Sequence, residues 1–352
     1  MSPAGQRQRF LAGSVIAGVL SVIFLLWIVL RIDGPRVTDG VDDIGELVAA
    51  WCATVMCIVA ASRSPMRRAG WVLLAASTFA WGVGELLWTY YDMVEHIAVP
   101  FPSWADAGFL TAAPLMFAGL LVFPCYPRRA AQRAQGLIDG CIIALALLFA
   151  SWETILGPLY RAHQGTVLKQ VLSLAYPMSD VVMASLVIIL IARARGMRRT
   201  TLGLVMVGVV AFAVADSSFA YLTEVNNYGI GNFLDTGWVA GFFMIGLGAL
   251  HDVTMPDPDE AHGEVSTISI MAPYVPVLLV LAVTTVQILR GVHIERVGWV
   301  MVFALALLVV GREIMRLWDQ ARNGRLLSDE LDPTHESALS RDRDADAALL
   351  RR

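Results

Sequence analysis

The chain has 352 residues, a formal net charge of −4 and a mean hydropathy of +0.63. With 57% hydrophobic and only 16% charged residues, the composition excludes an ordinary soluble domain. Its acidic balance also gives no sign of a nucleic-acid-binding surface.

Apolar runs recur along the whole chain, and most are long enough to cross a hydrocarbon core of about 30 Å. They predict an all-α, polytopic membrane helix bundle of about ten transmembrane helices. Residues 1–315 would form this membrane domain. In chain order, the predicted spans are roughly 10–30, 44–62, 70–91, 107–125, 136–157, 171–193, 200–222, 236–251, 270–289 and 297–315.

The distribution of arginine between the spans predicts the orientation. Alternate short connections are rich in arginine, which marks the cytoplasmic side of a membrane. These arginines are Arg7, Arg9, Arg63, Arg67, Arg68, Arg128, Arg129, Arg133, Arg193, Arg195, Arg198 and Arg199. The other connections carry acids, including Asp39, Asp42 and Asp43. We therefore expect a multi-pass protein of the plasma membrane, typical of a bacterial inner membrane, with both termini in the cytoplasm.

Three helical hairpins, at about 79–121, 148–190 and 211–250, share one pattern. In each, an acid lies near the end of one apolar helix and a second acid opens the next. The pairs are Glu85 and Asp106, Glu153 and Asp180, and Asp216 and Asp235. An internal repeat of this kind predicts that the six carboxylates lie on the same, extracytoplasmic side.

These acids are the candidate ligand-binding residues, because a carboxylate at membrane depth needs a partner, water or a ligand. Trp88 and Trp152 lie beside them, and their rings suit a ligand with an apolar body or a cationic head. Helix capping is the alternative role for Asp106 and Asp235. The full candidate set is Glu85, Trp88, Asp106, Trp152, Glu153, Asp180, Asp216 and Asp235.

No sequence motif for a nucleophile, a phosphate loop or a histidine metal site occurs, so we expect no enzymatic activity, no cofactor and no histidine-based metal centre. Carboxylates alone leave a cation site open. Asp139, near the start of the fifth span, is expected to cap its helix or to pair with the loop at residues 128–133.

The last span is expected to continue as a charged, amphipathic exit helix. Residues 316–352 would form this cytoplasmic helix and a disordered tail, too short for a catalytic domain. The segment Arg312–Leu327 is the predicted contact for a cytoplasmic signalling partner or for a second copy of the chain.

Three segments carry a family resemblance: Phe101–Ala107, Tyr176–Asp180 and Arg316–Leu327. They resemble the multi-span sensor regions of bacterial, especially actinobacterial, diguanylate cyclases and phosphodiesterases with GGDEF and EAL domains. This sequence departs from that family because it contains neither output domain. The resemblance implies sensing, with the output delivered through a partner.

Three functions are therefore considered. The first is a sensor that binds a small ligand, an ion or a proton in an acidic, aromatic pocket and relays the change through the exit helix. The second is a proton- or cation-coupled transporter or channel. The third is a membrane scaffold, in which the acids pair with bases on the same side, namely Arg161, Lys169, Arg290 and Arg296.

Overall fold

The computed structural model describes residues 3–122, 130–162, 166–193, 197–224, 229–254, 274–291, 293–318 and 320–321. Within these ranges the fold is all-α, as predicted, and no strand occurs. Residues 322–352, which include the rest of the predicted exit helix and the predicted tail, lie outside the described residues.

The described residues form a series of helices along the chain. They are α1 (Pro3–Leu30), α2 (Pro35–Arg63), α3 (Arg68–Thr89), α4 (Trp104–Val122), α5 (Ala130–Ser151), α6 (Gly157–Ala162), α7 (Val167–Arg193), α8 (Met197–Glu224), α9 (Thr236–Thr254), α11 (Tyr274–Leu289) and a terminal helix, Arg296–Trp318. Short elements extend some of them: the 3-10 turns η1 (Pro65–Arg67) and η4 (Phe233–Asp235), and the π-helical turns η2 (Tyr90–Val94) and η3 (Trp152–Leu156).

Each of the ten predicted spans overlaps one of these helices. In the described part, seven helices are long and apolar enough to cross a membrane, so the protein is a multi-pass membrane protein. The seven are Gly5–Leu30, Pro35–Arg63, Pro65–Val94, Trp104–Val122, Thr200–Thr223, Phe233–Thr254 and Arg296–Trp318. The apolar part of α11, Val277–Leu289, is shorter.

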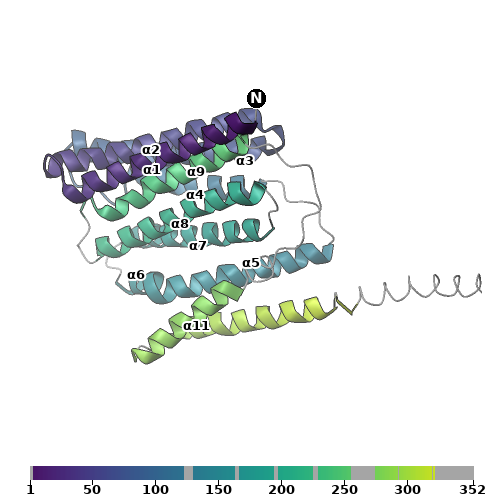
Figure 1. Ribbon diagram of the computed structural model, residues 1–352. Coiled ribbons are helices and arrows are strands. Elements are labelled where there is room, and N and C mark those ends of the chain that lie inside the picture. The colour runs from purple at the N-terminus through teal and green to yellow at the C-terminus, as the bar shows by residue number, and fades with distance from the viewer. Residues whose placement is uncertain are drawn as a thin grey trace, which may run out of the picture.

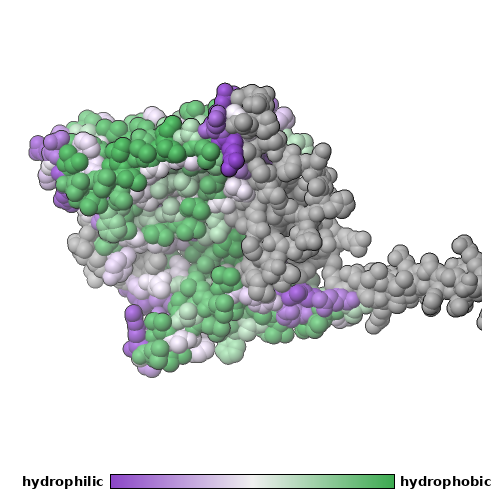
Figure 2. Space-filling view, in the orientation of Figure 1, coloured by the Kyte–Doolittle hydropathy of each residue, from purple (hydrophilic) through white to green (hydrophobic). Residues whose placement is uncertain are grey.

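The long helices lie roughly side by side and alternate in direction (Figure 1). One end of the bundle holds the α1–α2, α3–α4 and α8–α9 connections, on the left in Figure 1. We call it the carboxylate end, because the candidate acids lie toward it. The N-terminus and the α2–α3 turn lie at the opposite end. Figure 2 shows an apolar surface along the helices, with hydrophilic residues gathered near their ends.

The tight turn between α1 and α2 determines where α2 begins. Arg31, Asp33 and Gly34 all have positive φ angles, of 47°, 64° and 90°, and Pro35 occupies the first turn of α2. The helix therefore starts well before the predicted residue 44. Asp42 and Asp43, expected in a connecting loop, lie inside α2 and are buried.

Glycines allow two helix pairs to pack with their backbones close together. A Cβ atom on Gly108 of α4 would lie 2.5 Å from the backbone nitrogen of Gly84 in α3. Similarly, a Cβ on Gly208 of α8 would lie 2.7 Å from the carbonyl oxygen of Gly241 in α9. Such contacts are typical of small residues at membrane helix interfaces.

Two apolar clusters fill the main bundle. One includes Trp71, Leu74, Leu120 and Ile245, and the other joins Phe24 and Ile28 of α1 to α2 and α9. A third cluster joins α5 to α11 and the terminal helix through Phe149, Val280 and Leu305. We call these three helices the terminal unit. It adjoins the main bundle where α5 packs against α7.

Candidate functional site

The structure assembles two groups of buried acids. The first carboxylate group comes from α2, α3 and η4, and its members are 0–5% exposed. They are Asp42, Asp43, Glu46, Glu85 and Asp235. Only Glu85 and Asp235 were candidates from the sequence.

The members of the first group act on one another directly. The carboxyl groups of Asp42 and Asp235 are hydrogen-bonded. Glu46 lies within electrostatic range of Glu85, Asp42 and Asp43. Two carboxyl groups can share a hydrogen bond only when one of them carries a proton. The Asp42–Asp235 contact is therefore a proton-holding pair.

Backbone groups position both partners of this pair. The amide of Gly231, which has a φ of 75°, donates to Asp42 Oδ2 at 2.7 Å. Asp235 accepts from the amide of Asn232 at 2.6 Å, and Asn232 Oδ1 accepts in turn from Leu234, forming a capping box at the start of η4. The expected capping role of Asp235 thus coexists with its contact to Asp42.

Part of the first group has no hydrogen-bonding partner. Within the described part of the chain, Asp42 Oδ1 and Asp43 Oδ2 are buried and make no hydrogen bond. Across the same residues, Asp42, Asp43, Glu46 and Glu85 make no ion pair with a basic side chain. Buried charges are normally paired, so this arrangement favours neutral, protonated carboxyl groups.

The second carboxylate group lies between α4, α7, α8 and α9. Asp180 and Asp216 are hydrogen-bonded to each other, so they too form a proton-holding pair. The indole of Trp238 donates to Asp216 Oδ1 at 2.6 Å. Asp180 Oδ2 is buried and has no hydrogen bond among the described residues. We count Asp106, Tyr176 and Trp238 with this group.

Asp106 is held in place by two donors. The Tyr176 hydroxyl donates to Asp106 Oδ1 at 2.5 Å, and the Ser103 amide donates to Oδ2 at 2.6 Å. The second bond caps the start of α4, as the sequence allowed. Tyr176 also lies within electrostatic range of Asp216, so it links Asp106 to the proton-holding pair.

The tryptophan candidates lie in different places. Trp88 packs edge-on against Phe219, which packs against Trp238, with ring centroids 6.2 and 6.1 Å apart. Trp88 therefore adjoins the second group. Trp152 lies in η3 and packs against Tyr160 at 6.1 Å.

Glu153 belongs to neither group. It lies in the π-helical turn η3 and faces the terminal unit, where Gln287 of α11 donates to its backbone oxygen at 3.3 Å. Its electrostatic neighbours are Glu295 and Arg161. Arg161, considered as a partner for the candidate acids, pairs with Glu295 at 2.5 Å. The acids thus contact one another across hairpins, Asp180 with Asp216 and Glu85 with the first group, rather than within them.

Sequence reasoning missed Asp42, Asp43, Glu46 and Tyr176. The acids of α2 carry a signal that could have found them, since positions 42 and 46, and 43 and 46, lie on one face of a helix. Tyr176 carries no comparable signal. Among the described residues, no three His, Cys, Asp or Glu side chains are arranged to hold a metal ion.

The chain has no significant match to a protein-family model, to a curated protein or to a solved structure. The resemblance to sensor regions of cyclic-dinucleotide enzymes therefore stays a prediction. The class that fold and composition define is a multi-pass, all-α membrane protein.

Proposed function

We propose that the protein is a non-enzymatic membrane sensor that takes up and releases protons at its two carboxylate groups. The observation that carries this proposal is the Asp180–Asp216 pair, a carboxyl–carboxyl hydrogen bond with no basic partner in the described residues. Such a pair changes its charge when it gains or loses one proton.

The position of the first group favours sensing over transport. Asp42, Asp43, Glu85 and Asp235 lie near the ends of α2, α3 and α9, whereas a transporter places its coupling sites near the membrane midplane, at the interface of its repeats. Asp180 of the second group lies halfway along α7. The predicted output is movement of the terminal helix, which reaches Trp318 at the opposite end. A cytoplasmic partner or a second copy of the chain would receive this signal.

The proposal is tested by infrared difference spectroscopy of the reconstituted protein as the pH is stepped. A protonated carboxyl group has its own carbonyl band, and we expect this band to appear and disappear reversibly. It should weaken in Asp180→Asn and in Asp216→Asn. Asp252→Asn is the matched control, because Asp252 is ion-paired with Arg67 at 2.9 Å and should contribute no such band.

Flux measurements in proteoliposomes separate the alternatives. Proton-dependent flux that is lost in Asp180→Asn would replace the sensor with a transporter. If no carboxyl band responds to pH and no flux occurs, the acids have a structural role, as in a scaffold, and the proposal fails.

A further inference from the structure

We propose that the terminal helix is a releasable output arm, fastened to α5 and α11 by one charge lock at the end opposite to the carboxylate groups. The lock consists of Asp139, Tyr274, Arg312 and Glu313. This proposal names the element that would carry the signal of the proposed sensor. Only this signalling role rests on the proposed function.

Arg312 is the centre of the lock. It lies on the terminal helix and is 2% exposed. Its Nε atom donates to Asp139 Oδ1 on α5 at 2.5 Å, and its Nη1 atom donates to Glu313 Oε1 at 2.8 Å. Asp139 was expected to cap its helix or to pair with the 128–133 loop. It lies inside α5 and so does not cap that helix, and the structure pairs it with Arg312, a residue distant in sequence that tertiary packing brings to α5. The side chains of the 128–133 loop lie outside the described residues.

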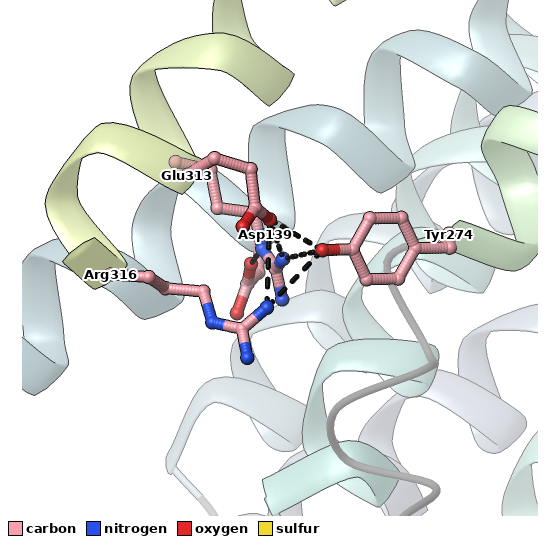
Figure 3. Close-up of polar contacts among 5 residues, drawn as sticks. Asp139, Tyr274, Glu313 and Arg316 are labelled. Carbon is pink, nitrogen blue, oxygen red and sulfur yellow. Dashed lines mark hydrogen bonds and ion pairs between the residues drawn. The ribbon is translucent and has the colours of Figure 1, made fainter. Parts of the chain in front are cut away.

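Tyr274, the first residue of α11, joins α11 to the contact between α5 and the terminal helix (Figure 3). Its hydroxyl accepts from Arg312 at 2.5 Å and from Arg316 at 3.3 Å, and it donates to Glu313. The guanidinium of Arg312 also lies 4.8 Å from the centre of the Tyr274 ring. The lock therefore forms only when α5, α11 and the terminal helix are all in place.

The other end of the arm is held more weakly. Gln287 reaches Glu153 at 3.3 and 3.4 Å, near the long limit for a hydrogen bond. Arg161 and Glu295 pair at 2.5 Å, but their side chains are 50% and 44% exposed, and exposed pairs contribute little. Between the two ends, the contact is the apolar cluster around Phe149 and Leu305.

This ion pair suits a lock because the side chain of Arg312 is only 3% exposed, while that of Asp139 is 24% exposed. Removing the charge of Asp139 leaves an uncompensated charge on Arg312 in a poorly hydrated place, whereas replacing both partners with apolar residues often costs nothing. The opposite face of the terminal helix is open: Phe303, Leu307 and Trp318 are 68%, 74% and 78% exposed. Once the lock opens, the remaining attachment within the described residues is the apolar cluster and the weak contacts near Glu153.

The test measures the distance between spin labels at Met66 and Trp318, which are 83% and 78% exposed. Both lie at the end opposite to the carboxylate groups. The four native cysteines are first replaced by serine or alanine. For the protein with its lock residues unchanged, we expect a single narrow distance distribution. For Arg312→Gln and for Asp139→Asn, we expect a second, longer distance to dominate. Tyr274→Phe keeps the ion pair, so it should fold normally and show the longer distance as a minor population.

Two further variants make the result decisive. Arg161→Gln, at the weakly held end, should leave the distribution unchanged. Asp139→Leu combined with Arg312→Met removes both charges and should restore the single short distance. One unchanged distribution in both Tyr274→Phe and Arg312→Gln would overturn the lock. If Arg312→Gln does not fold, the other two variants decide the result. The lock is then supported only if Tyr274→Phe shows the longer distance and the apolar double variant does not. Any other result overturns it. All measurements use one pH and leave both carboxylate groups intact, so failure here is distinct from failure of proton binding.

Discussion

Buried acids have different kinds of partner at the two ends of this bundle. At the carboxylate end, the buried acids of the first group contact one another, and Asp42, Asp43, Glu46 and Glu85 have no ion pair within the described part. At the opposite end, Asp252 and Asp139 are each paired with an arginine. An acid paired with an arginine keeps its charge and fastens helices together. An acid paired with another acid must hold a proton, which makes its charge adjustable.

Of the substitutions that compare the two ends, one at Asp252 is expected to change the free energy of unfolding most. This carboxylate, 5% exposed, accepts from Ser64, Arg67 and Trp71 and so ties the α2–α3 turn to α9. Asp252→Ala should lower the free energy of unfolding by about 3 kcal/mol, since it removes one member of a buried pair. Unfolding in mixed micelles measures this. Asp33→Asn, at an exposed position, is the control and should change little, because asparagine tolerates the positive φ of 64° there.

The carboxylate end should respond in the opposite direction. Glu46→Gln removes an acid that must either ionise among other carboxylates or bind a proton from neutral solution, and both cost free energy. We expect the variant to be more stable than the natural protein by about 1 kcal/mol at neutral pH. The same unfolding measurement applies. A loss as large as that of Asp252→Ala would show that Glu46 has a charged partner and would remove the contrast between the ends.

A third change tests how the second group is held together. Tyr176→Phe deletes the hydroxyl that donates to Asp106 at 2.5 Å and should cost about 1 kcal/mol of stability. It should also alter the infrared bands of the carboxyl groups, because Tyr176 adjoins Asp216 as well. Tyr160→Phe, at a position 52% exposed, is the matched control. Equal behaviour of the two variants would mean that Tyr176 does not link Asp106 to the proton-holding pair.

The smallest effect is expected for the exposed pair between Arg161 and Glu295. Arg161→Gln should change the unfolding free energy by less than about 0.5 kcal/mol, because solvent screens the pair. A double-mutant cycle with Glu295→Gln measures the coupling directly. A coupling as large as that expected of the pairs at the opposite end would mean that the carboxylate end is also fastened by charge.

The sequence predicts the helices well and the contacts between them poorly. Long apolar runs specify membrane helices locally, and the acids near their ends follow from the same pattern. Which acids meet depends on which helices become neighbours. The contact between α2 and α9 brings Asp42 to Asp235, and that between α7 and α8 brings Asp180 to Asp216. Neither of these contacts between helices can be deduced from the sequence of a single hairpin.

The sequence prediction placed Asp42 and Asp43 in a loop for a local reason. The turn at Gly34 and Pro35 starts α2 earlier than predicted.

The close approach of Gly84 and Gly108 has a mechanical consequence. Because backbone atoms have no rotamers to rearrange, we expect α3 and α4 to move together as one rigid hairpin. Glu85 of the first group lies on α3, and Asp106 of the second group lies on α4. A displacement of this hairpin that moves Glu85 would therefore also move Asp106, so we expect the two groups to be mechanically coupled.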